Sequence, residues 1–267
     1  MRNLKIFLFF LMATICNPIF AQRWELGLSG GGASYMGDLN QYNPIKISGV
    51  SGGGFAKINL SPRIALGVHY TFGQIAAADD QSDNAQFKSR NLSFYTPLHE
   101  VSLITEFNFF DMFKVNAKKY SPYVFVGIGD LFFDPRADYK GNAYSLSSYK
   151  TEGQGESYAT STIVIPYGGG VKYRMSEQFN VFTQVGFRVP LTDYLDDVSG
   201  NYPDKSLWGN TPGAIIRSAL SDRSGEQNGI YLGVPGTQRG DYRKRDSYMF
   251  ASIGISYTFA SRKCFKF

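Results

Sequence analysis

The chain has 267 residues, with 27 Lys and Arg against 22 Asp and Glu, and a net charge of +5 at pH 7. This mild basicity, with no Lys- or Arg-rich run and no recognition helix, argues against a nucleic-acid partner. Once the N-terminal segment described next is removed, Cys264 is the only cysteine, so neither an intrachain disulfide nor a cysteine-based metal site is possible. The richness in Gly, Tyr and Phe favours strands, close backbone approaches and aromatic girdles over helices.

The first 21 residues have the layout of a secretory signal peptide. An apolar run at residues 6–15 follows a basic start, and the small residue Ala21 ends the segment. The apolar run is too short for a membrane-spanning helix. Lipidation at Cys16 is disfavoured because a branched residue precedes it. We therefore expect residues 1–21 to be removed and residues 22–267 to form one large β domain.

Eight segments are predicted to be strands because apolar side chains recur at every second residue. Such alternation places one set of side chains on each face of a strand. In the last segment, Ile253, Ile255 and Tyr257 share one face, and small or polar residues occupy the other. The predicted strands are residues 23–36, 45–59, 64–72, 98–107, 123–133, 162–175, 180–189 and 247–259.

After a short first link at residues 37–44, the connections between strands alternate in length. Brief turns lie near Pro62, Lys114 and Glu177, and long polar loops lie near Asp83, Gly141 and Gly209. Short turns at one end and long loops at the other are typical of bacterial outer-membrane barrels. No segment after the N-terminal one is apolar for long enough to span as a helix, so a membrane location requires a barrel. We therefore predict an all-β fold, an eight-stranded antiparallel transmembrane β-barrel with short periplasmic turns and long extracellular loops.

The inward face of the predicted strands carries many charges. An eight-stranded barrel has room inside for side chains but not for an open pore. Opposite charges there could pair into a network that plugs and stiffens the barrel, and a lumenal proton or ion path is the alternative. The predicted lumenal charge network consists of Glu25, Lys57, Arg63, Glu100, Glu106, Lys172, Arg174 and Arg188.

Two features could suggest chemistry, and neither supports an enzyme. The glycine runs at residues 30–32 and 52–54 lie within strands and are not followed by Gly-Lys-Ser/Thr, so we interpret them as close backbone approaches rather than phosphate loops. His69 would face the lumen with Ser29 and Glu106, but the chain has no Gly-x-Ser-x-Gly motif. We predict no catalytic residue, no cofactor and no small-molecule substrate.

The loop after the seventh strand begins with Asp193, Asp196 and Asp197. Their oxygens could bind a hard cation such as calcium, although their spacing lacks the alternation of an EF-hand loop. A role in loop folding or partner docking and a plain solvated loop are the other interpretations, and we assign no metal ligand. The basic run at residues 239–245 could meet lipopolysaccharide phosphates or form a solvated rim.

Two motifs resemble a known family. The stretches ELGLSGGGASYMGDLN at residues 25–40 and TDYLDDVSGNYP at residues 192–203 resemble the PorG-type outer-membrane proteins of Bacteroidetes, a family otherwise labelled as of unknown function. The resemblance spans nearly the whole mature chain. It implies a barrel of the type IX protein secretion apparatus, which serves gliding motility in gliding bacteria, and association with a periplasmic ring lipoprotein and its partner. The positions that match the family pattern are Tyr35, Gly37, Asp38, Leu39, Thr192, Asp193, Tyr194, Asp196, Asp197 and Gly200.

The sequence therefore leads to a functional hypothesis with one main alternative. We expect a non-enzymatic barrel among outer-membrane lipids that docks periplasmic ring components through its basic turn at residues 114–120 and its tail at residues 262–267. The alternative is a free-standing small barrel that stabilises the envelope or binds ligands through its loops. The chain continues past the aromatic Phe259, which leaves the register of the last strand open.

Overall fold

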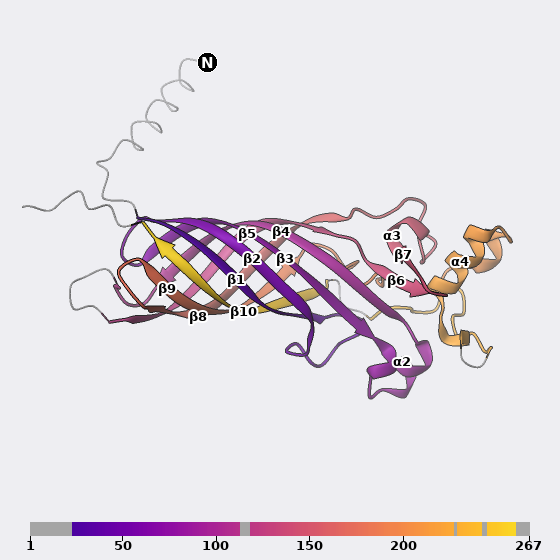
Figure 1. The fold of residues 1–267 in the computed structure, drawn as a ribbon. Coiled ribbons are helices and arrows are strands. Elements are labelled where there is room, and N and C mark those ends of the chain that lie inside the picture. The colour runs from indigo at the N-terminus through magenta and orange to yellow at the C-terminus, as the bar shows by residue number, and fades with distance from the viewer. Residues whose placement is uncertain (1–22, 113–117, 227–228, 242–244, 260–267) are drawn as a thin grey trace, which may run out of the picture.

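The computed structural model describes residues 23–112, 118–226, 229–241 and 245–259. Eight long strands form one closed antiparallel barrel, as the sequence predicted (Figure 1). Each strand pairs with the next along the chain, and β1 pairs with β10 to close the ring. The barrel strands are β1 (Arg23–Met36), β2 (Ile47–Asn59), β3 (Ile64–Ala78), β4 (Ser93–Asn108), β5 (Tyr120–Phe133), β8 (Ser161–Arg174), β9 (Phe179–Pro190) and β10 (Ser247–Thr258).

The strands β3 and β4 run further than their apolar patterns predicted. Their pairing continues past Gly73 and Leu98 to Ala76 opposite Tyr95 and Ala78 opposite Ser93. The polar composition of this stretch indicated a loop, but backbone pairing needs no apolar outward face where a strand extends beyond lipid. A short hairpin of β6 (Arg136–Tyr139) and β7 (Asn142–Ser145) adds to the edge of the extended β4.

The barrel has two unlike ends. The turn end holds the short connections and the first and last described residues, and the loop end holds the long connections (Figure 1). The long connections contain short helices that begin at side-chain caps, such as Asn84 before α2 and Thr211 before α4. These elements are η1 (Asp79–Gln81), α2 (Ala85–Arg90), α3 (Leu146–Tyr149), η2 (Lys205–Trp208), α4 (Pro212–Ser221) and η3 (Ser224–Glu226).

A band of apolar side chains faces outward around the barrel. Alternate residues of every barrel strand contribute to it, and Leu28, Val126 and Ile253 are more than half exposed. A contiguous apolar surface of this kind is unfavourable in water and typical of a wall that contacts hydrocarbon. The fold is therefore a membrane-spanning barrel. Within the described residues, no helix is both long enough and apolar enough to cross a membrane.

The main hydrophobic core lies at the loop end. Ala33, Tyr35, Ile75, Leu98 and Leu131 from the barrel pack in one cluster with Leu92, Leu146, Leu195, Val198 and Leu220 from the long connections. A smaller cluster of Ile104, Tyr123 and Phe125 lies in the barrel. We call the folded connections at residues 37–46, 79–92, 134–160 and 191–246, as far as they are described, the cap. The long loops are thus packed over the mouth of the barrel.

Candidate functional site

Four buried charges form a neutral cluster in the turn-end half of the lumen. Lys57 Nζ and Lys172 Nζ each lie 2.7 Å from a different oxygen of Glu106. Glu25 Oε1 lies 3.5 Å and 3.7 Å from the same two ammonium groups. Two carboxylates and two ammonium groups thus share one space, which is the geometry that a buried ion pair needs to offset its desolvation.

Neighbouring polar groups complete this cluster. Ser256 Oγ donates to Glu25 Oε1 at 2.6 Å, and Asn108 Nδ2 donates to Glu106 Oε1 at 2.8 Å. Lys57 Nζ also lies 4.7 Å from the ring centre of Phe55. Each of the four charged groups has an oppositely charged partner, and together they fill this half of the barrel.

A second set of charges lies nearer the loop end. Arg188 Nε is 3.3 Å from Glu100 Oε2, and Arg188 Nη1 donates to the carbonyl of Gly186 at 2.6 Å. The hydroxyl of Tyr248 donates to Glu100 Oε2 at 2.8 Å, and the guanidinium lies 4.6 Å from the ring centre of Phe250. Both charged side chains are at most 2% exposed.

Aromatic rings separate the two sets of charges. Phe55 stacks on His69 with ring centres 4.9 Å apart, and the ring centres of Phe55 and Phe182 are 5.6 Å apart. The cavity beside these rings has a volume of about 20 Å³, which is room for one water molecule. In the described part of the chain, neither Ser29 nor Glu106 hydrogen-bonds to His69. The lumen is therefore filled along its length, and the histidine takes part in its packing.

Two of the predicted lumenal charges lie outside this network. Arg63 is exposed because β3 begins one residue later, so the side chain belongs to the turn before the strand. Arg174 ends β8 and donates to the carbonyl of Met112 in the link between β4 and β5. For Arg63 the prediction extended the alternation beyond the end of the strand, whereas Arg174 lies within β8 on the same face as Lys172 and is half-buried at the turn end of the lumen.

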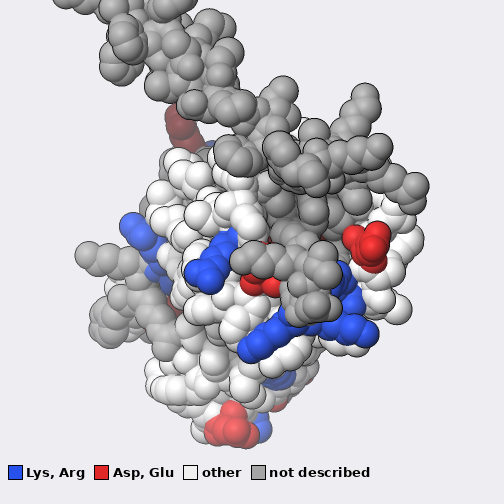
Figure 2. Space-filling view, turned by 90° about the vertical axis from the view of Figure 1, so that its left-hand side faces the viewer, with Lys and Arg blue, Asp and Glu red and all other residues white. Residues whose placement is uncertain are grey.

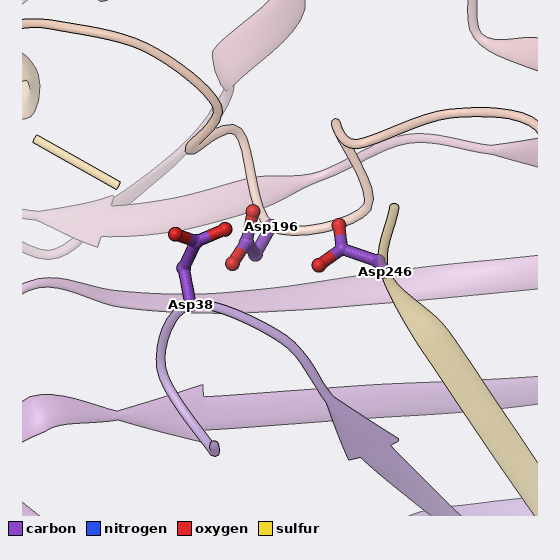
Figure 3. A group of neighbouring side chains, drawn as sticks. All are labelled: Asp38, Asp196 and Asp246. Atoms are coloured by element: carbon purple, nitrogen blue, oxygen red, sulfur yellow. The ribbon is translucent and has the colours of Figure 1, made fainter. Parts of the chain in front are cut away.

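At the loop end, three carboxylates point toward one another (Figure 3). Asp38 follows β1, Asp196 lies in the connection after β9, and Asp246 precedes β10. One oxygen of each lies within 4.8 Å of the others, and all three residues are buried. The hydroxyl of Tyr35 donates to Asp196 Oδ2 and lies 3.3 Å from Asp246 Oδ1. We call these three carboxylates the acid cluster.

The acid cluster has no basic partner among the described residues: no Lys or Arg side chain there forms an ion pair with it. Burial raises the pKa of Asp38 to about 7, and the charges of Asp241 and Asp193 act in the same direction. Burial, followed by mutual repulsion, raises the pKa of Asp196 and Asp246 well above their usual value. The cluster thus favours bound protons, and the same oxygens have the chemistry to hold a hard cation.

Asp197 points away from the acid cluster. Its φ angle of 67° turns the backbone, and its carboxylate accepts hydrogen bonds from Thr151 and, at 2.7 Å, from Tyr158. Arg239 Nη2 lies 3.6 Å from Asp197 Oδ2, and Arg239 Nη1 lies 3.1 Å from Glu152 Oε1. Burial raises the pKa of Asp197 to about 6, although the Arg239 charge opposes this shift.

These positions decide between the interpretations of the acidic loop. Asp196 and Asp197 are both buried, so the solvated-loop interpretation is wrong for them. They also point into different clusters, so they do not form one calcium loop with Asp193. Asp193 is partly buried and accepts a hydrogen bond from Ser199 Oγ at 2.8 Å. Loop folding is the interpretation that the geometry supports.

Further charges tie the connections of the cap together, and sequence reasoning missed most of them. Arg90 binds both oxygens of Asp79, at 2.7 Å and 2.8 Å. The same guanidinium donates to the backbone carbonyls of Arg239 at 2.8 Å and Asp38 at 3.1 Å. Asp79, Arg90 and Glu152 stand among polar residues in the sequence and therefore resemble solvated loop residues. The basic run at residues 239–245 lies partly outside the described residues.

The other family-motif positions lie at the loop end as well. Gly37 is buried, and a Cβ atom there would collide with Asp246 Oδ1 and the Tyr35 hydroxyl. Tyr194 stacks on Tyr158 with ring centres 4.3 Å apart. Leu39 belongs to the main core, Thr192 Oγ1 accepts from the backbone of Tyr194, and the backbone of Gly200 donates to Glu152. All ten motif positions therefore gather opposite the turn end.

Comparison with solved structures finds other small barrels at low sequence identity. Neisserial surface protein A is 9% identical, with 88% of this chain and 97% of that chain covered and a TM-score of 0.45. Ail of Yersinia pestis is 11% identical, with coverages of 89% and 99% and a TM-score of 0.39. The outer membrane protein OprG of Pseudomonas aeruginosa is 11% identical, with coverages of 90% and 98% and a TM-score of 0.38.

No curated protein matches the chain. A family model, described as a domain of unknown function (DUF6089), matches residues 2–211. This match includes the strands β1 to β9 and the acidic stretch after β9. Because it covers well over half of the sequence, the chain belongs to the DUF6089 family.

Proposed function

We propose that this protein is a non-enzymatic barrel of the bacterial outer membrane that works as a docking element of the type IX secretion apparatus. Its partners in this proposal are the periplasmic ring lipoprotein and the protein that accompanies it. The short turns and both chain ends of the barrel would lie in the periplasm, and the cap would lie outside the cell. The proposal combines the family resemblance of the sequence with the charge distribution of the turn end.

The basic surface at the turn end is the observation that carries the docking proposal. Lys118 and Lys119 are exposed in the link between β4 and β5, just before β5, and Arg63 is exposed in the turn before β3. Figure 2 looks at this end and shows Lys and Arg side chains gathered there, with fewer acidic ones. Exposed charges of one sign steer an oppositely charged partner and fix its orientation. An acidic patch on the ring is therefore the expected counterpart.

The filled lumen supports a structural role over transport through the barrel. The Glu106 and Glu100 clusters close it at two levels, and the aromatic layer around Phe55 lies between them. A rigid barrel with no pore can anchor other proteins at the membrane without leaking solutes. The tail at residues 262–267, a second expected docking surface, lies outside the described residues.

A pull-down with charge-reversed turns tests the docking proposal. Full-length protein carrying Lys118→Glu and Lys119→Glu would be captured from detergent-solubilised outer membranes and compared with the unaltered chain. We expect the ring lipoprotein to be recovered with the unaltered chain and to fall at least about tenfold with the variant, as for charges at an interface. A matched control reverses Lys88 and Lys140, which are exposed at the loop end.

Two outcomes would count against this role. If the variant still captures the ring lipoprotein, the basic turn is not part of the docking surface. Absence of the ring from the capture with the unaltered chain would favour a second candidate function, a free-standing barrel that binds ligands through its loops. The observation that favours this second candidate is a cleft on the side of the cap, between the β1–β2 link and the η1–α2 segment.

A further inference from the structure

A cleft with a volume of about 910 Å³ opens on the side of the cap. It lies between the link that joins β1 to β2 and the η1–α2 segment, which stand side by side in Figure 1. The extended parts of β2, β3 and β4, around Ser48, Ala76 and Tyr95, form its wall. A volume of this size is in the range of small-molecule binding sites. Leu39 is the family-motif position among its lining residues.

The lining of the cleft has the chemistry that recognises sugars. Amide side chains can both donate to and accept from hydroxyl groups, and aromatic rings pack against the C–H face of a sugar ring. The cleft combines amides with aromatic rings from both of its sides. The residues that matter here are Tyr42, Asn43, Gln81, Asn84, Phe87 and Tyr95. Tyr42 is 83% exposed, so its ring is available to a ligand.

The charges of the cleft favour the sugar part of a ligand over its phosphates. Lys46 is the basic residue among the lining side chains, and its Nζ already donates to Gln81 Oε1 at 2.9 Å. Asp83 and Asp138 also line the cleft. With one ammonium group and two carboxylates, the lining offers no site for a phosphate, so the phosphates of a bound ligand would lie outside the cleft while its uncharged sugar units lie inside it.

An exposed apolar rim connects the cleft to the membrane-facing wall. Ile45, Ile47 and Val50 are 70%, 52% and 72% exposed, and Val50 continues the outward face of β2 into the lipid-facing band. A water-soluble sugar has no apolar group that could pack against this rim. A glycolipid does, because its acyl chains are attached next to its sugar. Burial of these side chains against acyl chains would remove apolar surface from water.

We propose that the cleft binds the saccharide headgroup of a glycolipid in the outer leaflet, with acyl chains against the rim formed by Ile45, Ile47 and Val50. The inference uses the outer-membrane location from the proposed function but does not depend on docking to the ring. It assigns the loop end a ligand of its own, and it leaves the turn end free for a protein partner.

Binding to purified lipopolysaccharide tests the proposal. Full-length protein would be held in a detergent without a sugar headgroup and titrated with lipopolysaccharide and with its deacylated saccharide. We expect both to bind, with the saccharide at least about tenfold weaker because it lacks the acyl chains. Tyr42→Ala should weaken both by about tenfold. Tyr231→Ala, which removes a 59% exposed tyrosine elsewhere in the cap, should change neither.

Three results would overturn the proposal. Failure of lipopolysaccharide to bind the unaltered protein would rule out the glycolipid as the ligand, and unchanged binding by Tyr42→Ala would place the ligand elsewhere. Equal affinity for lipopolysaccharide and saccharide would show that the apolar rim takes no part, which overturns the glycolipid source. The variant with Lys118→Glu and Lys119→Glu should bind lipopolysaccharide normally, so this test and the docking test fail independently.

Discussion

Glu106 stands at the centre of the lumenal charges, because it accepts from two ammonium groups at 2.7 Å while Glu25 lies more than 3.4 Å from both. Glu106→Gln would leave two buried lysines with only the more distant carboxylate. We expect the free energy of unfolding to fall by about 3–5 kcal/mol, which is usual when one partner of a buried ion pair is removed. Glu25→Gln should cost less. The measurement is the temperature at which the folded band disappears on a heat-modifiability gel, and equal shifts for both variants would contradict this ranking.

Gly37 illustrates a different residue-scale constraint, close contact with two polar groups. A methyl group there would collide with the carboxylate of Asp246 and the hydroxyl of Tyr35. Gly37→Ala should therefore displace the acid cluster at a cost of about 1–3 kcal/mol, as for other overpacked sites. Amide hydrogen exchange at residues 193–200 that is faster in Gly37→Ala than in the unaltered protein would show this displacement. Gly213→Ala in α4 meets no atom within 4 Å and serves as the control, which should exchange normally.

At the scale of elements, the cap should loosen as the pH rises. The pKa of Asp38 is raised to about 7 in the folded cap, against about 4 in an unfolded chain. Protonated Asp38 therefore favours the folded cap, and this stability is full below about pH 4 and lost as the pH passes about 7. Asp196 and Asp246 have pKa values shifted in the same direction and add to the effect. Hydrogen exchange at residues 193–200, corrected for its intrinsic pH dependence, should be faster at pH 8 than at pH 5.

Asp38→Asn is the matched variant for this prediction. The amide keeps an oxygen that can accept from the backbone N–H of Asp241, and it carries no charge at any pH. We expect a smaller difference between pH 5 and pH 8 in this variant. The same difference in both proteins would mean that Asp38 does not titrate within the cap. Calcium that slows exchange only at pH 8 would identify the acid cluster as a cation site instead.

The sequence was sufficient to predict the barrel strands, because hydrocarbon imposes alternation on the outward residues. All eight predicted strands occur, and β1 has the predicted bounds. The bounds were least accurate for β3 and β4, which continue beyond the lipid-facing band. There the outward side chains no longer need to be apolar, so the pattern that identifies a strand disappears while its hydrogen bonds continue.

The cap could not be predicted in the same way. The contacts of Asp38 with Asp196 and of Arg90 with the backbone of Arg239 join residues more than a hundred positions apart. The spacing of residues along the sequence carries no information about such distant pairs. Charged residues within polar stretches are also indistinguishable from solvent-exposed loop residues in the sequence. The family pattern did mark Tyr35, Asp38 and Asp196, but only the fold reveals that they form one buried cluster.

At the scale of the whole molecule, the two ends have separate properties. The turn end presents exposed basic side chains, and the loop end presents a folded cap with an acid cluster inside and a cleft on its side. The filled lumen lies between them. A protein partner at one end and a lipid at the other could therefore be bound at once without sharing residues.

The filled lumen leads to a whole-molecule prediction that the barrel conducts no ions. Charge pairs close it around Glu106 and Glu100, and between them the cavity beside Phe55 has room for about one water molecule. Protein inserted into a planar lipid bilayer should show no steady current, whereas a 16-stranded porin in the same bilayer should. Because these barriers lie inside the barrel rather than in the cap, loosening the cap at pH 8 should not start a current. Stepwise openings at either pH would show that the buried pairs separate, and the barrel would then act as a channel.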